Sequence, residues 1–69
     1  MEKKYIAALL DEEGNEWWYE QTINGQDIFT KKESGFCRPK ILSETEAIQI
    51  ARRNADEDSE AAIVLFEGI

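Results

Sequence analysis

The chain has 69 residues, of which 15 are acidic and 8 are basic, and it contains one cysteine and no histidine. Its net charge of −7 disfavours direct contact with a nucleic-acid backbone, and its cysteine and histidine counts argue against a disulfide framework or a Cys/His zinc site. The length allows one small globular domain over residues 1–69, which buries only about 60% of the surface of the unfolded chain.

Three strands are predicted in the first half of the chain. Residues 4–10 are apolar on both faces, residues 16–23 are rich in aromatic and β-branched side chains, and residues 26–32 form the third strand. Asn24-Gly25, between the second and third strands, tolerates the positive φ angles of a type I′ hairpin turn. The following segment, 33–42, is either a loop or a loop with a short edge strand near 36–38.

A helix is predicted to begin after Ser43. Ser43-Glu44-Thr45-Glu46 is a capping box, in which the Ser43 hydroxyl accepts a hydrogen bond from the backbone N–H of Glu46. The residues that follow place their apolar side chains on one helical face, which consists of Ala47, Ile48, Ile50, Ala51 and Ala55. The acidic run 56–60 is expected to end the helix, and residues 61–66 form a last strand that is apolar on both faces.

The element order β-β-β-α-β predicts an α+β fold with two layers. One amphipathic helix covers one face of a four-stranded, antiparallel-rich sheet. The first and last strands are apolar on both faces, so we expect both to be interior. A simple solution places the last strand beside the first. This arrangement gives the spatial order third, second, first, last, with a right-handed crossover through the helix. The other face of the sheet is left open.

Strand pairing assigns side chains to the two faces of this sheet. With a four-residue loop over 12–15, the face toward the helix is expected to hold Ile6, Ala8, Leu10, Trp17, Tyr19, Ile23 and Ile28. The open face is expected to hold Tyr5, Ala7, Leu9, Trp18 and Phe29, together with Glu20, Thr22, Asp27 and Lys31. A bulge of one residue in the first loop would exchange the faces of the first strand.

The open face motivates the main functional hypothesis, a non-enzymatic module that binds a protein partner or a second copy of itself. Aromatic residues are enriched at interface hot spots, and an exposed apolar patch usually has a purpose. The predicted partner-binding residues are Tyr5, Leu9, Trp18, Phe29 and Lys31. The alternative is that Trp18 and Phe29 lie beneath the 33–42 segment, whose apolar side chains also need burial.

The acidity suggests a second function, because carboxylates on a compact fold can imitate phosphates and occupy the basic groove of a nucleic-acid-binding protein. The predicted acidic surface consists of Glu12, Glu13, Asp56, Glu57, Asp58 and Glu60. This profile is similar to that of small inhibitors from phages and mobile elements, including anti-CRISPR proteins, although no motif identifies a family. The plainer interpretation is that the charge keeps a small domain soluble.

Catalysis, cofactor binding and metal binding are not expected. The chain lacks a histidine base. Cys37 has Arg38 and Lys40 nearby, which could lower the pKa of its thiol, but it has no histidine partner. Glu16 stands where a calcium loop requires glycine, and the glycines are too isolated to form a phosphate loop. The acidity also argues against stacking of RNA bases on the sheet.

A cytoplasmic protein is the expectation from the N-terminus and the lone cysteine. The apolar run 5–10 has six residues and is followed by acids, whereas the core of a signal peptide needs about 7 to 15 apolar residues. No stretch approaches the ~20 apolar residues of a membrane span. One unpaired cysteine is typical of a reducing compartment.

Overall fold

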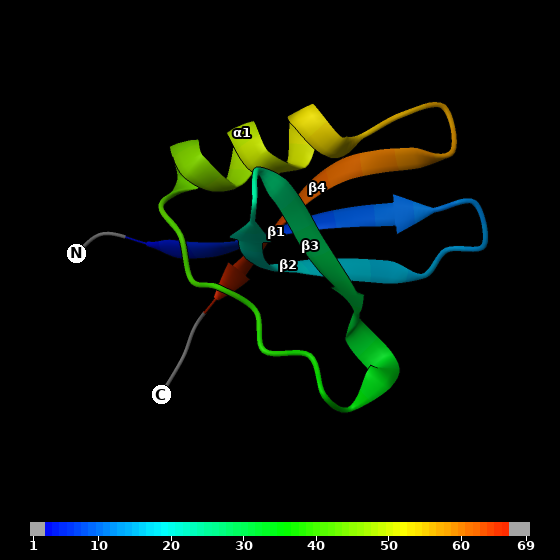
Figure 1. Cartoon of the computed structure of the whole chain (residues 1–69), viewed down its shortest axis with the longest axis horizontal. Helices are drawn as coiled ribbons and strands as arrows, with labels where there is room; N and C mark the ends of the chain where they lie inside the picture. Colours follow the sequence, from blue (N-terminus) through cyan, green and yellow to red (C-terminus); the bar gives the residue numbers. More distant parts are fainter. Residues whose placement is uncertain (1–2, 67–69) are drawn as a thin grey trace.

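The computed structural model describes residues 3–66 as a four-stranded sheet with one helix on one face (Figure 1). Its elements are β1 (Lys4–Asp11), β2 (Glu16–Ile23), β3 (Gln26–Lys31), the 3₁₀ helix η1 (Lys32–Ser34), α1 (Glu44–Asn54) and β4 (Ser59–Phe66). The predicted α+β class and element order are confirmed. Helix α1, with 11 residues, is too short to cross a bilayer, and residues 3–66 contain no other α-helix.

Helix α1 begins where the capping box predicts. The Ser43 Oγ accepts from the backbone N–H of Glu46 at 3.2 Å and donates to the Glu46 carboxylate at 3.1 Å. Three small or branched side chains, Ala47, Ile50 and Ala51, are buried against the sheet. Because two of these three are alanines, the helix axis can approach the sheet closely.

The sheet order β3-β2-β1-β4 confirms the predicted arrangement of strands. All of its neighbours are antiparallel, including β1 and β4, so the handedness rule for parallel crossovers does not apply to the connection through α1. The expectation that both doubly apolar strands are interior was wrong for β4. This strand pairs with β1 on one side and forms an edge of the sheet on the other.

Strands β1 and β2 pair one residue out of the predicted register, and this reverses the predicted faces of β1. Leu9 pairs with Trp17 and Leu10 with Glu16, whereas the sequence predicted Leu9 with Trp18. The cause is Asp11, whose carboxylate accepts the backbone N–H groups of Glu13 at 2.9 Å and Asn15 at 2.8 Å. The backbone N–H of Asp11 donates to the carbonyl of Asn15 at 3.0 Å, so Asp11 lies opposite Asn15 and not opposite Glu16. Tyr5, Ala7 and Leu9 therefore face α1, and Ile6, Ala8 and Leu10 face away from it.

A bulge at Glu20 produces the same reversal in β3. Beyond the Asn24-Gly25 turn, where both residues have positive φ as predicted, Gln21 pairs with Ile28 as expected. Glu20 then has no residue opposite it on β3, and Tyr19 pairs with Phe29. The bulge moves Phe29 to the helix side and Ile28 to the opposite side. It also moves Ile23, which is 48% exposed, out of the predicted core.

The segment between η1 and α1 forms no strand near 36–38. It enters the sheet instead at Leu42, which exchanges two backbone hydrogen bonds with Tyr5, of 2.7 and 2.8 Å. Lys40 donates to the carbonyl of Tyr19 on the neighbouring strand. Leu42 therefore fills the gap between the diverging ends of β1 and β2, and its side chain joins the core beneath α1. Phe36 is 87% exposed and covers nothing.

Asp27 connects the end of α1 to the β2–β3 hairpin. Its side chain is only 7% exposed and accepts two hydrogen bonds of 2.7 Å from Arg53. Asn54 and Thr22 donate to the same carboxylate at 2.7 and 2.6 Å. The Arg53 hydrogen bonds are the largest of the interactions that hold the pKa of Asp27 far below its usual range.

We expect Asp27→Asn to lower the free energy of unfolding at neutral pH by about 1–3 kcal/mol, because the charge-assisted bonds are lost. The carboxylate stabilises the fold fully above its ordinary pKa, and this stabilisation declines as the pH falls below about 5 and continues to decline into strongly acidic solution. Urea denaturation across this pH range should therefore give a flatter profile for the variant. Glu12→Gln, which removes an exposed carboxylate, serves as the control; an equal loss in both variants would contradict the role of Asp27.

Candidate functional site

The five predicted partner-binding residues do not share one face. Tyr5, Leu9, Phe29 and Lys31 lie on the helix side of the sheet, and Trp18 lies on the opposite side. Phe29 and Tyr5 pack against the core; the ring centroids of Phe29 and Tyr19 are 5.7 Å apart. The predicted open-face cluster is therefore divided between two surfaces, as a consequence of the two register shifts.

Trp18 is half-buried within a polar surround on the side away from the helix. Its indole N–H donates to the Glu16 carboxylate at 2.8 Å, and the Lys32 ammonium lies 5.4 Å from the ring centroid. Lys32 also forms an ion pair with Glu16 at 3.7 Å. These contacts occupy the polar atom and one face of the indole, so Trp18 does not form an open apolar patch.

The predicted acidic residues, in contrast, meet at one end of the molecule. Asp11 pairs with Ser59, so the loop after β1 and the loop before β4 lie side by side, at the right of Figure 1. We call this region the acidic end; it comprises Asp11, Glu12, Glu13, Asp56, Glu57, Asp58 and Glu60. Within residues 3–66 these carboxylates form no ion pair. A concentrated negative charge therefore faces solvent there.

An apolar hollow opens beside the acidic end, on the helix side of the sheet. Leu9, Trp17 and Phe29 contribute its apolar lining, and Asp11, Asp56, Asp58 and Ser59 contribute the polar lining. We call it the acid-rimmed hollow. No residue of α1 lines it, because the helix ends at Asn54 and only the following loop extends over this part of the sheet. Two residues of the predicted binding face, Leu9 and Phe29, thus adjoin two residues of the predicted acidic surface.

Asp11 links the lining of the hollow to its charge. Its carboxylate accepts the Trp17 indole N–H at 3.0 Å in addition to the loop amides. The bond from Trp17 is the largest of the effects that lower the pKa of Asp11 below its usual value. The carboxylate therefore remains ionised in mildly acidic solution, and the indole plane is fixed beside it.

Trp17 and Asp11 were not predicted as site residues from the sequence. Trp17 was assigned to the core because the alternation of β2 directs it toward the helix side, and that direction is correct. Sequence patterns did not indicate that α1 stops short of Trp17. Asp11 is followed by two more acids, and only the loop geometry distinguishes its carboxylate from theirs.

Cys37 lacks the environment of a reactive thiol. The sequence suggested that Arg38 and Lys40 could lower the pKa of this thiol, but burial chiefly raises it, and the charge of Glu20 adds to the effect. The thiol lies 3.7 Å from the carbonyl of Thr30. The Glu20 carboxylate accepts the backbone N–H of Arg38 at 3.3 Å and so keeps the negative charge beside the thiol.

Within residues 3–66, no three histidine, cysteine or acidic side chains are arranged to hold a metal ion. The carboxylates of the acidic end are spread along two loops and the strand ends that adjoin them. Sequence and structure comparisons find no significant match to a protein-family model, a curated protein or a solved structure. Function is therefore inferred from the chemistry of the chain's own surfaces.

We expect the Cys37 thiol to react with iodoacetamide at neutral pH more slowly than free cysteine does, because less of it is ionised. Glu20→Gln should increase the rate several-fold by removing the neighbouring negative charge. Glu33→Gln is the matched control, since it removes an exposed carboxylate elsewhere. A wild-type rate above that of free cysteine would show that Cys37 is an activated nucleophile.

Proposed function

We propose that this protein is a small, non-enzymatic interaction module that binds a basic segment of a protein partner at the acid-rimmed hollow. The observation that carries the proposal is the combination of an apolar lining (Leu9, Trp17 and Phe29) with carboxylates at its edge (Asp11, Asp56 and Asp58). An arginine or lysine side chain matches this combination, because its hydrocarbon stem is apolar and its end group is cationic.

Each part of the hollow has a defined role in this proposal. The apolar lining receives the methylene groups of the partner's side chain, and the Trp17 ring offers a surface for its cation. The Asp56 and Asp58 carboxylates attract the charge; Asp56 is oriented by the backbone N–H of Asp58, which it accepts at 2.8 Å. The rest of the acidic end speeds the encounter with a basic partner through its long-range field.

An NMR titration with a capped Gly-Arg-Gly peptide tests this function. We expect weak, saturable shifts of the Trp17 indole N–H and of the amides in the 56–59 loop. A capped Gly-Gln-Gly peptide should produce no comparable shifts. Asp58→Asn should weaken binding about three-fold, which is the scale of one exposed ion pair, and Leu9→Ala should also weaken it.

Glu33→Gln is the control for the loss of one charge, and it should leave the titration unchanged. Equal binding of the arginine and glutamine peptides would refute the proposal, as would shifts that avoid the hollow. The fold of each variant is checked by the dispersion of its amide spectrum.

A second candidate function is imitation of nucleic acid, which the joining of two acidic runs at one end supports. In this case the carboxylates would stand in for phosphates in the basic groove of a nucleic-acid-binding protein, as in the anti-defence inhibitors of phages. The apolar lining would then be incidental. Glu12 and Glu13, which do not line the hollow, would matter as much as Asp56 and Asp58.

Affinity for polyarginine measured against salt concentration separates the two functions. If the acidic end imitates phosphates, neutralising Glu12 and Glu13 should weaken binding and flatten its salt dependence as much as neutralising Asp56 and Asp58, and Leu9→Ala should have no effect. If the hollow is the site, Leu9→Ala should reduce affinity at every salt concentration, and the Glu12 and Glu13 variants should have the smaller effect.

A further inference from the structure

The outer edge of β4 is long, apolar and unprotected. Natural sheet edges are usually shielded by lysine, proline, a bulge or a covering segment, because their unpaired backbone groups can bind another strand. Over Ser59–Phe66 the strand contains no lysine, arginine, proline or glycine. Ala61 is exposed on it, and Leu65 and Phe66 are each 42% exposed. Among residues 3–66, only β1 pairs with this strand.

The opposite edge of the sheet has a different character. Strand β3 has six residues against eight in β4, and most of them are polar. Asp27 on this strand is held by Arg53, and the adjacent β2 carries the bulge at Glu20. The strand also runs directly into η1 at Lys32. The β3 edge is therefore protected against pairing with another strand, and the β4 edge is suited to it.

We propose that β4 pairs with β4 of a second copy of this chain, antiparallel about a two-fold axis at Ile63, to form a continuous eight-stranded sheet. The evidence for a second copy is the order of side-chain sizes along the strand. Small residues, Ala61 and Ala62, precede Ile63, and larger ones, Val64 and Leu65, follow it. Antiparallel pairing about Ile63 sets Ala61 against Leu65 of the second copy, and Ala62 against its Val64.

The charges along the strand favour the same arrangement. The acidic end adjoins the start of β4, and Lys3 and Lys4 lie near its finish, since Lys4 pairs with Phe66. Antiparallel pairing places Glu60 opposite Phe66 of the second copy. Because Phe66 pairs with Lys4 within each chain, Glu60 and that copy's Lys4 then lie on the two sides of the same Phe66. The two acidic ends would lie at opposite ends of the joint edge, about 25 Å apart, well beyond the ~8 Å screening length of physiological salt.

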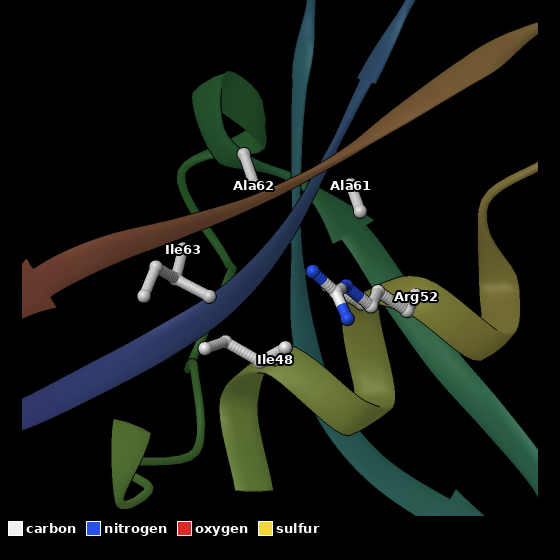
Figure 2. Close-up of a pocket in the computed structure, with 6 residues that line it drawn as sticks. Ile48, Arg52, Ala61, Ala62 and Ile63 are labelled. Carbon is white, nitrogen blue, oxygen red and sulfur yellow. The ribbon is translucent and has the colours of Figure 1, made fainter. Parts of the chain in front are cut away.

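The helices also fit this geometry. Helix α1 packs on both β1 and β4, and its last residues bind Asp27 of β3. Antiparallel pairing of two β4 strands about a two-fold axis keeps both helices on the same face of the joint sheet, one on each side of the joint edge. The groove between α1 and β4 is lined by Ile48, Ala51, Arg52 and residues 61–63 (Figure 2). Figure 2 shows Ile48 and Arg52 projecting from the helix beside β4, where the second helix would lie.

Sedimentation equilibrium across the micromolar range tests the pairing. The wild-type chain should reach twice its mass of 8.0 kDa. Ala61→Lys and Leu65→Lys each place a charge on the pairing edge at an exposed position, and we expect both variants to be monomers. Ile23→Lys is the matched control, because Ile23 is equally exposed on the far hairpin, and it should remain a dimer.

Cross-linking tests the register without requiring a lysine variant to fold. In a Cys37→Ser background, a mixture of Ala61→Cys and Leu65→Cys chains should form a disulfide dimer on mild oxidation. Directly opposed strand residues have Cα atoms about 4.5–5.5 Å apart, within the range that a disulfide spans. Either variant alone should cross-link slowly, because its two cysteines would be about 13 Å apart along the strands.

Three results would overturn the inference: a monomer at every concentration, a dimer that persists in both lysine variants, or equal cross-linking of the single variants and the mixture. None of them bears on the acid-rimmed hollow, which lies on the sheet surface and is tested by peptide titration. Failure of the pairing and failure of the proposed function are therefore distinguishable.

Discussion

The carboxylate of Asp11 determines which side chains of β1 face helix α1 and which face away from it. By accepting two loop amides and the Trp17 indole N–H, it holds the conformation of the loop after β1 and with it the pairing of Leu9 with Trp17. A shift of one residue would exchange every side chain of β1 between the faces. The same bonds hold the indole and the charge together, so one carboxylate organises both the core and the acid-rimmed hollow.

The parts of the fold that depend on local chemistry were predictable from the sequence. The capping box at Ser43 specifies where α1 begins, and Asn24-Gly25 specifies the hairpin turn. The faces of β1 were not predictable, because residues 5–10 are all apolar and either register would bury apolar side chains. Hydrophobic alternation gave no preference there, so the faces of β1 depend on the hydrogen bonds of the Asp11 carboxylate to the loop. The faces of β3 depend separately on the bulge at Glu20.

The candidate site combines two surfaces that the sequence suggested separately. The acidic runs were visible as charge, and Leu9 and Phe29 were visible as large apolar residues in predicted strands. Their proximity depends on the pairing of Asp11 with Ser59 and on the helix ending at Asn54, and neither follows from composition. A helix α1 that was one or two turns longer would extend over Leu9, Trp17 and Phe29. These side chains would then be covered, and no hollow would lie beside the carboxylates of the acidic end.

The edge position of β4 follows from the small size of the fold. A sheet of four strands has two interior places, and β2 occupies one of them because hairpins join it to both β1 and β3. The apolar β4 is left at an edge, beside a core in which three of the six buried residues are alanines, namely Ala7, Ala47 and Ala51. Small side chains contribute little hydrophobic stabilisation, so a monomer of this size has little reserve. Pairing at β4 would add backbone hydrogen bonds and bury Leu65 and Phe66. Because association stabilises the folded state by mass action, the stability of the fold and occupation of this edge would rise together.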